Sequence, residues 1–142
     1  MDKNRLSRVL GIDYGDRRIG LALSDPLRII AKPLTIIDRQ KTEDYFSAIL
    51  RIAKENETGT IVVGVPYTMK GKHSKQTNVV EEFMEQLKSS SEIPVVGIDE
   101  RLSSVAAEKA LQLQAIKTGH KKGRVDETAA AILLQEYLDS RS

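Results

Sequence analysis

The chain has 142 residues, with 22 Lys plus Arg and 20 Asp plus Glu, so its formal net charge is +2. This length predicts a single domain over residues 1–142 with a sizeable core, and the near balance of charges excludes a histone-like polycation. The absence of cysteine excludes disulfides and thiolate zinc sites, and the 4% aromatic content argues against base stacking as the main binding device.

The N-terminal segment is polar, and no run of 18 apolar residues occurs in the sequence. The lack of cysteine also suits a reducing compartment. We therefore expect a soluble, cytoplasmic protein with no signal peptide and no membrane association.

The first part of the chain predicts three antiparallel strands. Residues 8–14 are apolar up to Asp13 and then turn at a glycine, as expected for a buried strand. Residues 18–24 alternate apolar and small side chains, which predicts a second strand, and residues 28–37 predict a third. Pro33 lies inside the third strand and so places it at a sheet edge. The short turns between these strands imply a meander.

The rest of the chain alternates helices with short apolar strands. Thr42 is the predicted N-cap of a helix that carries Glu43 and Asp44 in its first turn. Continuous apolar runs at 60–65 and 94–98 predict buried parallel strands. Three further helices are predicted around 79–87, 103–115 and 124–138, and a basic loop is predicted at 116–123.

Helical connections make the later strands parallel to one another, so we expect an α/β fold with a five-stranded mixed sheet in the order 3-2-1-4-5 and helices on both faces. Strands one, four and five then end at the same edge, where open α/β sheets bind ligands. That edge collects Asp13, the turn at Val65–Pro66 and the pair Asp99–Glu100.

Asp13 is the first candidate for a functional residue. An ionised carboxylate at the mouth of a buried strand is costly unless it is paired, and carboxylate oxygens are the ligands that Mg²⁺ prefers. The alternative is a turn-forming Asp that accepts backbone N–H groups around Gly15.

Asp99 and Glu100 follow the run at 94–98. Adjacent residues of a strand point to opposite faces, so only one of these carboxylates can face Asp13. We favour Glu100, because its longer side chain can reach past the neighbouring strand. The alternative is that both are ordinary charges at a helix N-terminus.

Asp126 begins the last predicted helix and is followed by three alanines, 129–131, which let a helix lie close to a sheet. The alternative is an Asp that only complements the helix dipole. Together with Asp13 and the pair at 99–100, we interpret Asp126 as the third member of a metal site.

Basic residues occur in two segments that should border this acidic edge. Cations around an acidic metal site suit a polyanion, since phosphate contacts position a nucleic acid without reading its sequence. The alternative is an ordinary solvated loop. The residues are Lys70, Lys72 and Lys75 in the first segment, and Lys117, Lys121, Lys122 and Arg124 in the second.

Four motifs, in order along nearly the whole chain, resemble the YqgF/RuvX family. They are GIDYGDRRIG at 11–20, VGVP at 63–66 with Met69 and Gly71, DERLS at 99–103, and KGRVD at 122–126 with Ala129 and Ala130. The resemblance implies a ribonuclease-H-like fold similar to RuvC-type Holliday junction resolvases, and a nuclease that matures the 5′ end of pre-16S ribosomal RNA. It also implies that Asp13, the pair at 99–100 and Asp126 form the acidic site. One departure from the wider superfamily is the absence of an acid in Gly64-Val65-Pro66.

From these residues we expect a metal-dependent endonuclease that uses Mg²⁺ or Mn²⁺. Asp13, Glu100 and Asp126 are the expected metal ligands, and Asp99 is the further catalytic candidate. The expected phosphate-binding residues are Arg18, Arg101, Lys70, Lys72, Lys121, Lys122 and Arg124.

The expected partner is nucleic acid. A resolvase usually dimerises to cut two strands symmetrically, and the sequence has no obvious dimer stripe, so we favour pre-rRNA over branched DNA and a monomer or weak homodimer. Two other classes are open: a nucleotide-clasping kinase or ATPase, which needs a second domain, and a non-catalytic RNA-binding factor in ribosome assembly.

Overall fold

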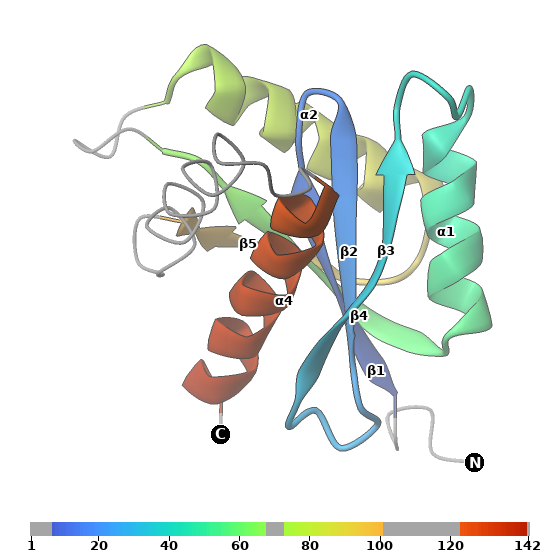
Figure 1. Ribbon diagram of the computed structural model, residues 1–142, viewed down its shortest axis with the longest axis vertical. Helices are drawn as coiled ribbons and strands as arrows, with labels where there is room; N and C mark the ends of the chain where they lie inside the picture. The colour runs from blue at the N-terminus through green and yellow to red at the C-terminus, as the bar shows by residue number, and fades with distance from the viewer. Residues whose placement is uncertain (1–6, 68–72, 101–122, 142) are drawn as a thin grey trace.

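The computed structural model describes residues 7–67, 73–100 and 123–141, with side chains in the last segment described from Ala129 onward. Five strands form one mixed sheet in the order β3-β2-β1-β4-β5, as predicted (Figure 1). The strands are β1 (Arg8–Tyr14), β2 (Arg18–Ser24), β3 (Ala31–Asp38), β4 (Thr58–Val65) and β5 (Val95–Asp99), and the helices are α1 (Tyr45–Glu55), α2 (Lys75–Ser90) and α4 (Gly123–Ser140). The predicted helix at 103–115 and most of the basic loop lie outside the described residues.

The sheet has a helix layer on each face. β1 pairs antiparallel with β2 and β2 with β3, whereas β1 pairs parallel with β4 and β4 with β5. Helix α4 crosses one face, in front in Figure 1, and α2 passes behind the sheet. Among the described residues, no helix is both long and apolar enough to cross a bilayer.

The two faces of the sheet carry different side chains, because successive residues of a strand point to opposite sides. The face under α1 and α2 holds the larger core cluster, which includes Ile12, Leu21 and Phe83. The face under α4 holds a smaller cluster around Ala130 and Leu134.

Strand β3 begins three residues later than predicted, because Asp25 organises the preceding loop. Its carboxylate accepts hydrogen bonds from the backbone N–H groups of Leu27, Ile29 and Ile30 at 3.1, 2.7 and 2.7 Å. Pro33 lies in β3 opposite Ala22, where the register shifts. The prediction that proline marks an edge strand is therefore confirmed.

The predicted cap of the first helix was wrong by two residues. Asp44, not Thr42, is the N-cap of α1: its carboxylate accepts from the backbone N–H of Ser47 at 3.1 Å and from the Ser47 hydroxyl at 2.7 Å. Both are recognised capping residue types, and the hydrogen bonds to Ser47 identify the one that caps this helix.

The run at 94–98 forms the predicted parallel strand, but the prediction that this strand is buried was wrong. β5 is the terminal strand of the sheet, and its Val96 side chain is 37% exposed. An apolar run therefore does not distinguish a central strand from an edge strand here.

Candidate acidic site at the carboxyl edge of the sheet

Asp13 is a buried carboxylate on the face of the sheet that α4 covers. It is 5% exposed and lies opposite Gly20 of β2. It shares its face with Gly11, because residues two apart in a strand point the same way. A Cβ added to Gly11 would lie 2.8 Å from the Leu134 Cβ, so α4 passes close over this part of β1. The predicted close approach of the alanine-bearing helix is confirmed.

Glu100 lies on the same face as Asp13. Gly64 of β4 pairs with Ile98 of β5, and Ile98 packs against the α4 side of the sheet. A Cβ added to Gly64 would lie 2.7 Å from a carboxylate oxygen of Glu100, so this carboxyl group rests against Gly64.

The β1–β4 register brings Asp13 to the other side of Gly64. Ile12 pairs with Val63, so the next residues along these parallel strands, Asp13 and Gly64, are neighbours. The structure therefore brings Asp13 and Glu100 together across a glycine on one face. The glycine matters because any larger residue would occupy the space of the Glu100 carboxylate.

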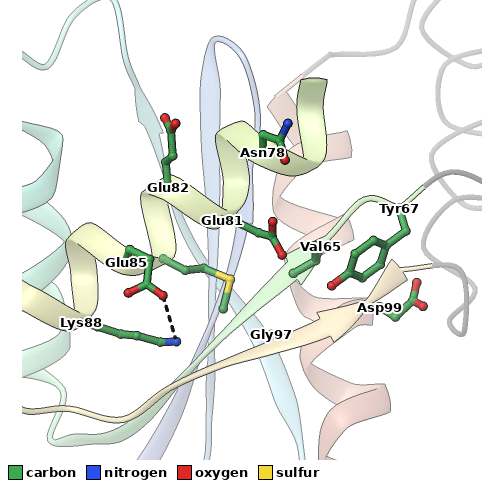
Figure 2. A pocket seen from close by; sticks show the side chains of 10 residues that line it. Val65, Tyr67, Asn78, Glu81, Glu82, Glu85, Lys88, Gly97 and Asp99 are labelled. Carbon is green, nitrogen blue, oxygen red and sulfur yellow. Dashed lines mark ion pairs between the residues drawn. The ribbon is translucent and has the colours of Figure 1, made fainter. Parts of the chain in front are cut away.

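Asp99 lies on the opposite face. It lines a cleft of about 830 Å³ between β5 and α2, together with Val65, Tyr67 and Glu81. Figure 2 shows Asp99 and Tyr67 at one end of this cleft, with the glutamates of α2 on its other side. Of the two adjacent acids, Glu100 is thus the one that shares a face with Asp13.

Asp126 is the fourth residue of α4. It precedes Ala130 by one helical turn, and the Ala130 carbonyl oxygen lies 3.4 Å from the Cβ position of Gly11. Helix α4 begins at the same end of the sheet as the β1–β2 turn (Figure 1). The Asp126 side chain is outside the described part, and among the described side chains no group of three acids or histidines could hold a metal ion.

Arg18 is the one expected phosphate-binding residue whose side chain the structure describes. It is the first residue of β2 and lies two residues before Gly20, the partner of Asp13. It therefore shares the face of Asp13 and is partly exposed. The side chains of Arg101, Lys70, Lys72, Lys121, Lys122 and Arg124 lie outside the described part of the chain, as does that of Lys117. Lys75 is the first residue of α2.

Sequence reasoning missed Arg39, which holds the turn after Asp13. Its Nη1 donates to the carbonyl oxygens of Gly15 at 2.9 Å and Asp16 at 3.0 Å. Its guanidinium carbon lies 4.7 Å from the ring centre of Tyr14 and 5.2 Å from that of Tyr45. The available signal was its position: in a meander, a residue just after the third strand lies beside the first turn.

Tyr14 anchors the end of β1 on the other face. Its hydroxyl lies 2.8 Å from that of Tyr45, and its ring stacks on Phe83 at 3.9 Å. Burial raises the pKa of Tyr14 far above its usual value, and the hydrogen bond to Tyr45 raises it further, while the nearby Arg39 opposes the shift. Tyr14 is therefore neutral in the folded protein at physiological pH.

Comparison with solved structures places the fold in a class. The chain superposes on Thermus thermophilus RuvC in complex with a Holliday junction substrate with a TM-score of 0.59, covering 95% of both chains at 17% identity. It superposes on the fowlpox virus resolvase, also in complex with Holliday junction DNA, with a TM-score of 0.56, covering 94% of this chain and 98% of that chain at 14% identity. The fold is thus the ribonuclease-H-like fold of the RuvC-type resolvases.

Comparison of sequences identifies the family. The model of the RuvX family, described as Holliday junction resolvase, matches residues 7–140. A relative in Roseiflexus sp. (strain RS-1) is 41% identical over 134 residues, which are 94% of this chain and 95% of the relative. A relative in Chloroflexus aurantiacus is 43% identical over 133 residues, which are 94% of this chain and 87% of the relative. Both are named "Putative pre-16S rRNA nuclease". The chain belongs to the RuvX family, and the resemblance found in its motifs is confirmed.

Proposed function

We propose that this protein is a metal-dependent endonuclease that hydrolyses phosphodiester bonds during maturation of the 5′ end of pre-16S ribosomal RNA. The observation that carries the proposal is the placement of Asp13 and Glu100 on either side of Gly64, on the face that α4 crosses. Membership in the RuvX family and the names of the relatives support the nuclease chemistry.

The residues present fit a hard divalent cation. Carboxylate oxygens are the donors that Mg²⁺ and Mn²⁺ prefer, and the bare α-carbon of Gly64 leaves the space that the Glu100 carboxylate occupies. Asp13, Glu100 and Asp126 would hold the ion, and we do not assign this role to Asp99, because it lines the cleft on the other face. A bound ion would supply an activated water and would neutralise charge on the phosphate.

The chain itself positions the reacting groups. Asp13 lies in the middle of the sheet, between β2 and β4, so its carboxylate sits on rigid backbone. Arg18 contacts a backbone phosphate from the same face. The six further phosphate-binding residues are Arg101, Lys70, Lys72, Lys121, Lys122 and Arg124.

A four-way DNA junction is the second candidate substrate. The family description and the junction-bound RuvC and fowlpox complexes favour it. We favour RNA, because the relatives at 41% and 43% identity are named for pre-16S rRNA, whereas the junction-bound structures are 17% and 14% identical and share the fold alone.

We further propose that residues 1–142 act as one ribonuclease-H-like domain in the cytoplasm, as a monomer or weak homodimer. Sedimentation of the purified protein at micromolar concentration tests the oligomeric state. A stable dimer at nanomolar concentration would instead favour symmetric cleavage of a DNA junction.

Cleavage of labelled pre-16S RNA beside a labelled four-way DNA junction tests the function. Each substrate is incubated with Mg²⁺, with Mn²⁺ and with chelator, and with the wild type, Asp13→Asn and Asp139→Asn. Asp139 is an exposed acid near the far end of α4, so its variant controls for the loss of one negative charge.

The proposal expects RNA cleavage by the wild type and by Asp139→Asn only when a metal ion is added, and none by Asp13→Asn. Unchanged cleavage by Asp13→Asn would refute the site. RNA binding without cleavage in either metal would identify a non-catalytic assembly factor, and cleavage of the junction alone would identify a resolvase.

A further inference from the structure

The β1–β2 turn is clamped by the segment that follows β3. Besides the two side-chain hydrogen bonds of Arg39, its backbone N–H donates to the Arg17 carbonyl oxygen at 2.7 Å. All three carbonyl groups of the turn, at Gly15, Asp16 and Arg17, are thus bonded to one residue. The Nη1 group can make both side-chain bonds at once because it carries two N–H donors.

The guanidinium of Arg39 is itself fixed in place. It packs over the rings of Tyr14 and Tyr45, whose hydroxyl groups bond to each other. Tyr14 belongs to β1 and Tyr45 to the start of α1. Arg39 therefore ties the turn to two elements of the larger core.

The clamped turn lies between two residues of the candidate site. Asp13 precedes it and is held by strand pairing on both sides, with β2 and with β4. Arg18 follows it as the first residue of β2, where the Gly15 N–H donates to the Arg18 carbonyl oxygen at 3.0 Å and Asp38 of β3 lies opposite. The backbone position of Arg18 thus depends on the turn and on the end of β3, the two segments that Arg39 joins.

We propose that Arg39 is a positioning residue for substrate: by fixing the β1–β2 turn, it holds the backbone of Arg18 so that this residue meets a nucleic-acid phosphate on the face of Asp13. This inference rests on the proposed function, because it takes Arg18 as a phosphate contact. Arg39 itself lies against the other face of β1, over Tyr14, and acts through the turn rather than by touching substrate.

The test compares Arg39→Met, Arg39→Lys, Arg18→Ala and the double variant Arg18→Ala/Arg39→Met in steady-state cleavage of RNA. Methionine keeps an apolar chain over the two tyrosine rings but donates no hydrogen bond, and lysine keeps the charge and N–H donors without the flat guanidinium that packs over the rings. Arg51→Ala is the matched control, because Arg51 is an exposed arginine on α1 whose ion pair is with Glu55.

We expect Arg39→Met to raise KM about fivefold or more, with kcat changed by less than about twofold, because a misplaced phosphate contact weakens substrate binding rather than the chemical step. Arg39→Lys should recover part of the loss, and Arg51→Ala should match the wild type. In the Arg18→Ala background, Arg39→Met should add almost nothing to KM. Hydrogen exchange of the peptide 14–18 should be faster in Arg39→Met.

A full KM effect of Arg39→Met in the Arg18→Ala background would overturn the inference, as would a loss of kcat with KM unchanged. Failure of the wild type to cleave RNA would instead be a failure of the proposed function. In that case the same variants are compared in RNA-binding affinity. Arg39→Met is expected to weaken RNA binding in the wild-type background and to add almost nothing in the Arg18→Ala background. Independent effects of the two substitutions on binding would again refute the role of Arg39.

Discussion

The two faces of the sheet use the same strands for different purposes. Under α1 and α2, the strands present large apolar side chains such as Ile12 and Val63, which form the main core. Under α4, the next residues of the same strands are Asp13 and Gly64, which bring a buried carboxylate beside a close-packed glycine.

The comparison shows how a small domain can hold buried charge without losing its core. Because side chains alternate along a strand, a residue and its neighbour can serve the site and the core separately. Asp99 and Glu100 repeat this division at the end of β5, where one lines the α2 cleft and the other rests against Gly64. If the two faces are independent, a substitution on one face should leave the other unaffected.

The largest effect is expected on the α4 face from Asp13→Asn. Asparagine has nearly the same shape but lacks the negative charge that a divalent ion requires. We expect kcat for RNA cleavage to fall on the order of 10³-fold or more, with the urea unfolding midpoint lowered little or not at all. A variant that loses activity only by unfolding would contradict the separation of the two faces.

The neighbouring substitution Ile12→Ala should affect the other face. Ile12 is fully buried in the larger core, so truncation leaves a cavity and should cost about 2–5 kcal/mol of unfolding free energy. At a temperature where the variant remains folded, kcat and the metal concentration for half-maximal cleavage should stay close to those of the wild type. A large shift in the metal requirement would mean that the core face controls the site.

Gly64→Ala and Gly11→Ala separate the site from simple close packing. Both add one methyl group on the α4 face, but at Gly64 it meets the Glu100 carboxylate, whereas at Gly11 it meets Leu134. Each should lose about 1–3 kcal/mol of stability through overpacking. Only Gly64→Ala should also lose about tenfold or more in kcat, because the added methyl group displaces the Glu100 carboxylate, a proposed metal ligand. Equal activities in the two variants would show that Glu100 is not part of the site.

The smallest effect concerns pH and the cap of α1. Hydrogen bonds from the Ser47 hydroxyl and from its N–H hold the pKa of Asp44 below its usual value. The ionised cap thus stabilises the fold at neutral pH, and this contribution is lost as the pH falls through the folded-state pKa. The thermal midpoint of Asp44→Ala should be below that of the wild type at pH 7 and should approach it near pH 2. An equal difference in thermal midpoint at both pH values would exclude the carboxylate charge of Asp44 as the cause.

Strand order and the division between faces could be predicted from the sequence, because they follow from local patterns. Alternation at 18–24, the short turns and the helical connections were enough to give the order 3-2-1-4-5, which the structure confirms. The same alternation separated Asp99 from Glu100, and Glu100 was favoured for its longer side chain, whereas its contact with Gly64 was seen only in the structure.

The features that could not be predicted depend on contacts between distant parts of the chain. Pattern alone did not place the cap at Asp44 rather than Thr42, since both types cap helices. The predicted order placed β5 at the sheet edge, but its apolar run was read as buried and did not reveal the exposure of Val96. The bonds from Arg39 to Gly15 and Asp16 span 24 and 23 residues, so only the meander topology, and no local pattern, places Arg39 beside this turn.

The most direct measurement of the central claim is the metal-dependent cleavage rate of Glu100→Gln beside Asp99→Asn. The two residues are adjacent in sequence and each substitution removes one carboxylate charge, so the comparison tests which face of the sheet carries the site. Glu100→Gln is expected to abolish RNA cleavage at every Mg²⁺ concentration, or to require far more Mg²⁺, while Asp99→Asn cleaves at close to the wild-type rate. Wild-type cleavage by Glu100→Gln, with activity lost in Asp99→Asn, would contradict the assignment of the site to the α4 face.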